Sequence, residues 1–182
     1  MPWMQGFLTV PQTARGYDAQ VVMNEAVEEA INRQIHAELA SAHLYLAMSA
    51  SFAAEGLPGC SHWMRVQARE EVEHAMRFID HLADRGGRVT LAALDQPPSE
   101  FGSARSAFEH VLEHEREVTR SIHTLYELSL EQRDHASQPL LLSFISEQIE
   151  EEKSAAEIVD QLRMVGDSKG SLLFIDRHLG KR

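Results

Sequence analysis

Cysteine is almost absent from this sequence: the only one among its 182 residues is Cys60. A single thiol cannot form an internal disulfide, and it excludes the cysteine-rich sites that hold structural zinc. Positive charge is also scarce, because 17 Lys and Arg stand against 28 Asp and Glu and leave a formal net charge of −11. This imbalance argues against a nucleic-acid partner, which needs clustered cations, and favours a protein that attracts cations.

Long apolar runs are missing too. No stretch approaches the roughly 20 residues that a membrane-spanning helix needs. The start of the chain lacks the basic segment followed by an apolar segment that marks a secretory signal. We therefore expect a cytoplasmic protein with no membrane partner. The remaining composition, 43% apolar and 25% charged, is ordinary for one globular domain.

The chain divides into an irregular start and a helical remainder. Residues 1–22 lack hydrophobic periodicity and hold two prolines and two glycines, so we interpret them as an extension outside the fold. Residues 23–182 form the expected domain, in which apolar spacing predicts helices and no strand of useful length. Ser137 is an available cap for the fourth helix. The expected helices cover residues 24–55, 60–85, 104–132, about 138–165 and 171–179.

The connections between these helices predict their packing. The first and third links are short, which favours antiparallel helical hairpins. The middle link of about 17 residues could reach roughly 56 Å when extended, whereas a helix of about 30 residues is roughly 45 Å long. This link could therefore run along the whole bundle and make the second and third helices parallel. The predicted fold class is all-α, a four-helix bundle with one long crossover and a short C-terminal fifth helix.

An acidic residue interrupts the apolar stripe of each long helix near its middle, and the spacing repeats. In each hairpin, 33 residues separate an acid on the first helix from a polar residue on the second, and another polar residue follows three positions later. Folding the hairpins together would bring six side chains to one level of the core: Glu38, Glu71, His74, Glu115, Gln148 and Glu151.

Buried carboxylates are costly unless something compensates their charge. These residues could satisfy one another, or the stripes could be rotated so that the acids face solvent. Repetition in register favours a third interpretation, in which divalent cations neutralise the clustered carboxylates. Oxygen-rich ligands with one imidazole suit iron, manganese or zinc. Because Gln148 is a neutral amide and a poor ligand, we expect the second metal to be held loosely.

Three stretches carry a family resemblance. "NRQIHAELASAHLYLAMS", "QAREEVEHAMRFIDHL" and "SEQIEEEK" resemble the bacterial non-haem ferritins, and the resemblance extends over residues 23–179. It implies a ferritin-like bundle, and a homo-oligomeric shell of 24 subunits. It also implies ferroxidase activity, in which two iron(II) ions per subunit are oxidised by dioxygen or hydrogen peroxide and the iron(III) product is stored as mineral inside the shell.

The resemblance also assigns roles to individual residues. It places the first iron at Glu38, Glu71 and His74, and the second at Glu115 and Glu151 with Gln148 beside it. Tyr45, two turns after Glu38, matches a tyrosine that could donate an electron, although a buried tyrosine is often only core. A third, displaced metal site would use residues that could equally form a solvated acidic face: Glu70, Glu147 and Glu150.

Two related families and two other functions are alternatives to a non-haem ferritin with ferroxidase activity. Haem-binding bacterioferritins carry a methionine after the second-helix glutamate and a second histidine, where this chain has Val72 and Glu151, so we expect no haem. Rubrerythrins need several cysteines. Two functions remain as alternatives to the ferroxidase: a metal-storing shell without oxidase activity, and a di-iron oxygenase. The amide of Gln148 argues against the oxygenase, which usually needs two tight sites.

Overall fold

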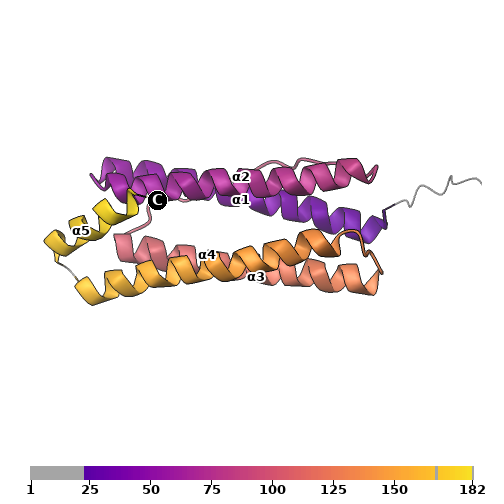
Figure 1. Ribbon diagram of the computed structural model, residues 1–182. Coiled ribbons are helices and arrows are strands. Elements are labelled where there is room, and N and C mark those ends of the chain that lie inside the picture. The colour runs from indigo at the N-terminus through magenta and orange to yellow at the C-terminus, as the bar shows by residue number, and fades with distance from the viewer. Residues whose placement is uncertain (1–22, 167, 182) are drawn as a thin grey trace, which may run out of the picture.

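Five helices and no strand occur in the computed structural model, which describes residues 23–166 and 168–181. The expected extension over residues 1–22 lies outside the described residues. Helices α1 and α2 form one antiparallel pair, α3 and α4 form the other, and α5 packs across one end of the bundle (Figure 1). Their bounds are Glu25–Ala54 for α1, Pro58–Asp84 for α2, Ala104–Glu131 for α3, Gln138–Val165 for α4 and Lys169–Leu179 for α5.

Polar side chains fix where α1 and α3 begin. The carboxamide oxygen of Asn24 accepts hydrogen bonds from the backbone N–H groups of Ala26 and Val27. The hydroxyl of Ser103 accepts one from Ser106. These caps satisfy donors that the first turn leaves without a partner. The predicted starts and ends of both helices are correct to within one residue.

Helices α2 and α5 begin two residues earlier than predicted, and the expected cap of α4 lacks its side-chain hydrogen bond. Helix α2 begins at Pro58, where a residue without an N–H suits the first turn. Helix α5 begins at Lys169, after a cap by Ser168. Ser137 stands at the N-cap position of α4, but its side chain makes no cap hydrogen bond; its hydroxyl donates to the Asp134 carboxylate at 2.7 Å instead.

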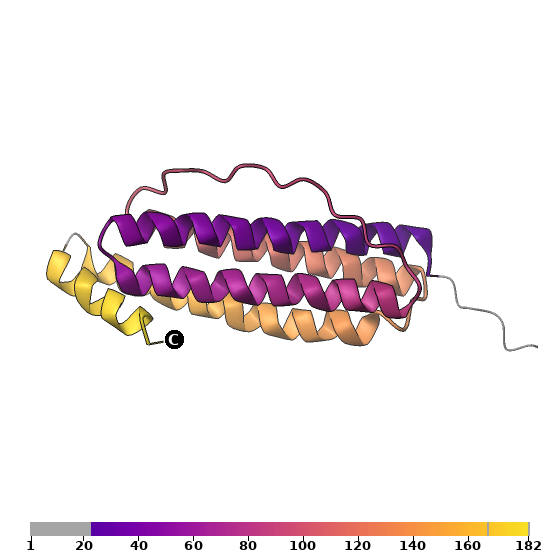
Figure 2. The same cartoon turned by 90° about the horizontal axis from the view of Figure 1, so that it is seen from above.

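The link between α2 and α3 runs back along the whole length of the bundle, over α1, as Figure 2 shows. Its path is fixed near its start by Asn32 of α1. The side-chain amide of Asn32 donates to the carbonyl oxygen of Arg88 at 2.9 Å, and its oxygen accepts from the N–H of Thr90 at 2.7 Å. The predicted long crossover, with α2 and α3 parallel, is confirmed.

The apolar core consists of two clusters at the two ends of the bundle. One cluster, with Phe52, Trp63 and Phe108, extends to α5. The other contains Phe78 and Phe144, whose rings stack with centroids 4.3 Å apart. The level between them holds the buried acids. Within the part of the chain that is described, no helix is both long and apolar enough to cross a membrane.

Candidate metal centre

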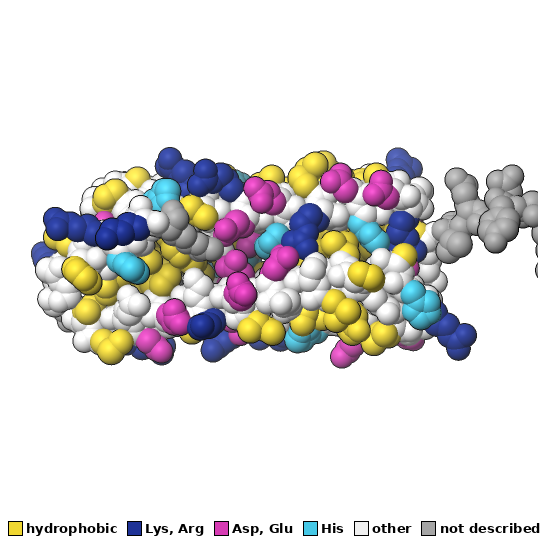
Figure 3. Space-filling model, viewed as in Figure 1, with side chains coloured by type: hydrophobic (Ala, Val, Ile, Leu, Met, Phe, Trp, Pro, Cys, Tyr) yellow, Lys and Arg dark blue, Asp and Glu magenta, His cyan; other side chains and the backbone are white. Residues whose placement is uncertain are grey.

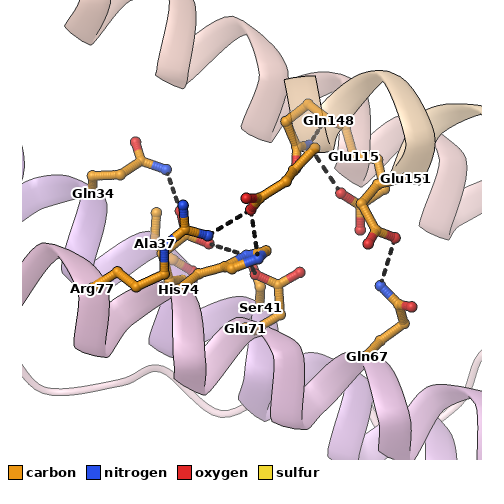
Figure 4. Close-up of polar contacts among 12 residues, drawn as sticks. Gln34, Ala37, Ser41, Gln67, Glu71, His74, Arg77, Glu115, Gln148 and Glu151 are labelled. Carbon is orange, nitrogen blue, oxygen red and sulfur yellow. Dashed lines mark hydrogen bonds and ion pairs between the residues drawn. The ribbon is translucent and has the colours of Figure 1, made fainter. Parts of the chain in front are cut away.

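Each of the four long helices contributes a buried polar residue to the middle of the bundle. Glu38 of α1 is 0% exposed, Glu71 of α2 is 2%, Glu115 of α3 is 1% and Gln148 of α4 is 2%. The four side chains lie on the stripes predicted from helical spacing, so the alternative of rotated stripes with solvent-facing acids is wrong. Figure 4 shows several of these side chains converging from both hairpins.

Glu38, Glu71 and His74 form a compact group of metal-binding atoms. One ligand atom from each lies within 4.8 Å of the others, and among the described residues no other acid–histidine–cysteine group of three meets this spacing. The Nδ1 atom of His74 lies 3.6 Å from Glu71 Oε2 and 3.9 Å from Glu38 Oε2. A single cation between these atoms would contact all three residues.

Two carboxylate oxygens in this group have no hydrogen-bond partner among the described residues. The buried Oε2 atoms of Glu38 and Glu71 accept no hydrogen bond from the described residues. The other oxygen of Glu38, Oε1, accepts one from Gln34 Nε2 at 2.8 Å. A buried acceptor without a partner is costly, and both such atoms face the imidazole nitrogen. The donor set therefore fits a divalent cation.

Burial and mutual repulsion raise the pKa of these acids. Burial, followed by the charge of Glu71, raises the pKa of Glu38 well above its ordinary value. Burial raises the pKa of Glu71 to about 8; a hydrogen bond with Glu38 acts in the opposite direction, and the charges of Glu115 and Glu151 add to the rise. Burial also raises the pKa of Glu115. Because a cation binds the ionised form, metal binding at this centre must release protons.

The other half of the centre is organised by hydrogen bonds. Glu115 accepts one from the Tyr45 hydroxyl and one from Gln148 Nε2 at 3.2 Å. Glu151 is half-buried and accepts one from Gln67 Nε2 at 2.9 Å. Gln148 thus turns its amide nitrogen, not its oxygen, toward Glu115. In this half, hydrogen bonds from Tyr45 and Gln148 occupy both oxygens of Glu115, and a looser second metal position stays a prediction.

Tyr45 lies inside the centre. It is fully buried, its hydroxyl donates to Glu115, and its ring meets the His114 ring edge-on at 5.8 Å. Burial and the charges of Glu115 and Glu71 raise its pKa well above the ordinary value, so it stays protonated at neutral pH. Proximity to the acids is therefore established, whereas electron donation remains a prediction.

The three acids expected at a displaced third site differ in their surroundings. Glu70 is half-buried, Glu150 is exposed, and Glu147 is 40% exposed at its side chain and bonded to Arg77 at 2.6 Å. Within the described residues they do not form a close group of ligand atoms. Acidic side chains gather at the middle of the face formed by α2 and α4 (Figure 3), so a more open site there remains a prediction.

Sequence reasoning missed the two glutamines that support the acids. Gln34, which is 2% exposed, holds Glu38 and accepts from the Ser121 hydroxyl at 2.6 Å. Gln67 holds Glu151. The sequence does contain a signal for these two residues. Each glutamine lies four residues before an acid of the repeat, and 33 residues separate the two glutamines.

Comparisons with known proteins agree with this geometry. A family model described as a ferritin-like domain matches residues 28–165. A bacterial non-heme ferritin from Bacteroides fragilis is 40% identical over 161 residues, covering 88% of this chain and 100% of the relative. One from Campylobacter jejuni is 33% identical over 158 residues, covering 87% and 95%. An open-pore ferritin from the hyperthermophilic archaeon Archaeoglobus fulgidus has a TM-score of 0.87 and 49% identity, covering 88% of this chain and 98% of its own.

Proposed function

The chain belongs to the ferritin family, and from that premise we propose that it stores iron and oxidises iron(II) with dioxygen at the centre between its four long helices. The observation that carries the proposal is the pair of buried Oε2 atoms, on Glu38 and Glu71, that face His74 and accept no hydrogen bond from residues 23–166 and 168–181. A cation supplies the missing partner. The names of the relatives support storage of iron.

The residues divide between two iron positions. Glu38, Glu71 and His74 bind the first iron(II), and Glu115 and Glu151 bind the second more weakly. Gln148 donates to Glu115 through its amide nitrogen, and its neutral amide oxygen is a weak ligand for the second iron. Two iron(II) ions supply two electrons, which together with two protons reduce dioxygen to hydrogen peroxide. Tyr45 donates a hydrogen bond to Glu115 and so orients a ligand of the second iron.

The raised pKa values of the acids allow the centre to be emptied of metal between rounds of oxidation. An acid that is protonated when the site holds no metal avoids the repulsion between neighbouring carboxylates. It loses its proton when iron(II) binds and regains one when the iron(III) product departs. The centre thus tolerates being emptied, which storage requires because each product must leave before the next pair of ions arrives.

We further propose that 24 copies of the chain form a closed shell, with α5 packing against other copies of itself. Helix α5 has 11 residues, too few to be stable alone. It leaves Phe174 76% exposed and Leu173 49% exposed, and the neighbouring end of α4 leaves Met164 79% exposed. Apolar side chains of this size support contacts between subunits.

Iron loading followed by exposure to oxygen tests the function. Two iron(II) ions per chain are added anaerobically to chelator-treated protein, and absorbance of iron(III) is followed after air is admitted. We expect rapid oxidation, and protein-bound iron(III) after repeated additions and gel filtration. Glu127→Gln, an exposed acid on α3 away from the centre, should match the parent.

The alternatives give different results. Iron bound without faster oxidation than in protein-free buffer would indicate storage without oxidase activity. Steady oxygen consumption with an added organic substrate, and no retained mineral, would indicate an oxygenase. Failure to bind iron(II) would refute the proposal.

A further inference from the structure

The second nitrogen of His74 faces a carboxylate from the opposite hairpin. While Nδ1 lies beside Glu38 and Glu71, Nε2 lies 3.4 Å from Glu147 Oε2. The same oxygen of Glu147 accepts a hydrogen bond from Arg77 Nη1 at 2.6 Å. His74 and Arg77 both belong to α2, and Glu147 belongs to α4. Figure 4 shows Arg77 beside His74, at the edge of the centre.

Arg77 is itself held in place by α4. Its Nη2 atom donates to Ser143 Oγ at 2.6 Å, and its guanidinium lies over the Phe144 ring, 4.0 Å from the centroid. Phe144 in turn meets the His74 ring edge-on at 5.2 Å. The guanidinium group therefore donates to two residues of α4, Glu147 and Ser143. Because Arg77 is held in this way, it fixes the position of the Glu147 carboxylate.

A histidine that binds metal through Nδ1 carries its proton on Nε2 and needs an acceptor there. A carboxylate in that position fixes both the ring orientation and the tautomer. We propose that Glu147, held by Arg77, is this acceptor, so that Arg77 and Glu147 are positioning residues for His74. The inference rests on the proposed function, because it gives His74 a metal to bind.

This role competes with membership of a third metal site. A cation on Glu147 Oε2, the oxygen that contacts both Arg77 and His74, would have to displace Arg77 and would leave His74 without its acceptor. The exposed fractions of the side chains make the proposal testable. His74 is only 13% exposed, whereas Arg77 and Glu147, at 35% and 40%, are in contact with solvent and can be substituted without creating a cavity in the core.

Cobalt(II) binding tests the proposal without any oxidation. Chelator-treated assembled protein is titrated anaerobically with cobalt(II) by calorimetry, and the tightest dissociation constant is compared among variants. Arg77→Met removes a cation near the site, so simple electrostatics predicts tighter binding. Loss of a residue that positions a metal ligand predicts weaker binding, by about tenfold or more. Because exposed charges contribute little, we expect a net weakening of about threefold to tenfold.

A double substitution shows whether the two residues act together. Glu147→Gln should also weaken the tight site, and Arg77→Met with Glu147→Gln should be little worse than the more severe single variant. Arg77→Lys, which keeps a cation in reach of Glu147, should retain most of the affinity. The control is Arg163→Met, which breaks a different pair between helices: Arg163 of α4 donates to Glu109 of α3 at 2.9 Å. This variant should bind cobalt(II) as the parent does.

Several outcomes would overturn the proposal. Tighter cobalt(II) binding in Arg77→Met would show that Arg77 acts only by charge. An unchanged tight site in Glu147→Gln, with loss of a weak site, would show that Glu147 belongs to the third site. A lower melting temperature with unchanged affinity in both single variants would show a purely structural pair. Absence of any tight site in the parent would refute the proposed function instead.

Discussion

Glu71 is expected to destabilise the metal-free protein. Its Oε2 atom is buried without a partner, and burial raises its pKa to about 8. Glu71→Gln removes the possibility of charge, so we expect a melting temperature equal to or higher than that of the parent after chelator treatment. The same substitution should slow initial iron(II) oxidation by roughly tenfold, about 1.4 kcal/mol in the barrier.

Glu115→Gln is the informative comparison for Glu71→Gln. It should slow oxidation similarly, but without the gain in stability, because Glu115 already accepts bonds from Tyr45 and Gln148 and a new amide would leave one donor facing another. Melting curves beside oxidation traces provide both readouts. If Glu71→Gln melted lower and oxidised iron at the parental rate, Glu71 would be a structural core residue.

The same acid predicts a dependence of stability on pH. Between its ordinary pKa of 4.5 and its folded value of about 8, the folded chain holds a proton that the unfolded chain has lost. The contribution of Glu71 to the stability of metal-free protein therefore falls as pH rises through this window. Denaturant unfolding of the parent and Glu71→Gln across these pH values should show a difference that widens with pH. A constant difference would contradict the shifted pKa.

At the scale of elements, one buried aspartate of α5 bonds to the start of α2. Asp176 is 3% exposed, and its Oδ1 atom accepts a hydrogen bond from the N–H of Cys60 at 2.8 Å. The start of α2 lacks a cap from its own preceding residue, Leu57. Asp176 thus acts as the cap of α2 from 116 residues away, and its charge lies near the positive end of the helix dipole.

Substitutions at this contact should release α5. Asp176→Ala removes the cap and should lower the free energy of unfolding by about 1 kcal/mol. Gly59→Ala should act more strongly, since a Cβ at residue 59 would lie 1.6 Å from the Asp176 carbonyl oxygen. Proteolysis of the link before α5 and melting curves would measure both effects. Asp160→Ala, an exposed acid on α4, is the control; equal protease sensitivity in all three variants would contradict the capping role.

At the scale of the whole molecule, the proposed shell requires the exposed face of α5. We expect analytical ultracentrifugation to give a single species with the mass of 24 chains. Phe174→Ser should leave the helical circular dichroism spectrum unchanged and shift the distribution toward smaller species, because Phe174 is 76% exposed in the isolated chain. Glu127→Gln, an exposed polar position on α3, is the control. A stable monomer or dimer of the parent at physiological salt would refute the shell.

Local sequence determined most of the architecture. Helical spacing of apolar residues is a property of each segment alone, and it predicted the four long helices and the buried faces that carry Glu38, Glu71 and Glu115. The length of the middle link predicted the crossover. The repeat of 33 residues placed the acids at one level, because the two hairpins have the same dimensions. The asymmetry of the centre was visible in Gln148.

Only the tertiary structure decided which partners these residues have. The hydrogen bond from Gln67 to Glu151, the contact of Glu147 with His74 and Arg77, and the cap that Asp176 provides for α2 all join separate helices. Such contacts depend on the rotation of each helix about its axis and on side-chain rotamers. Neither is encoded in the spacing of a single segment, because both are selected when the helices pack against one another.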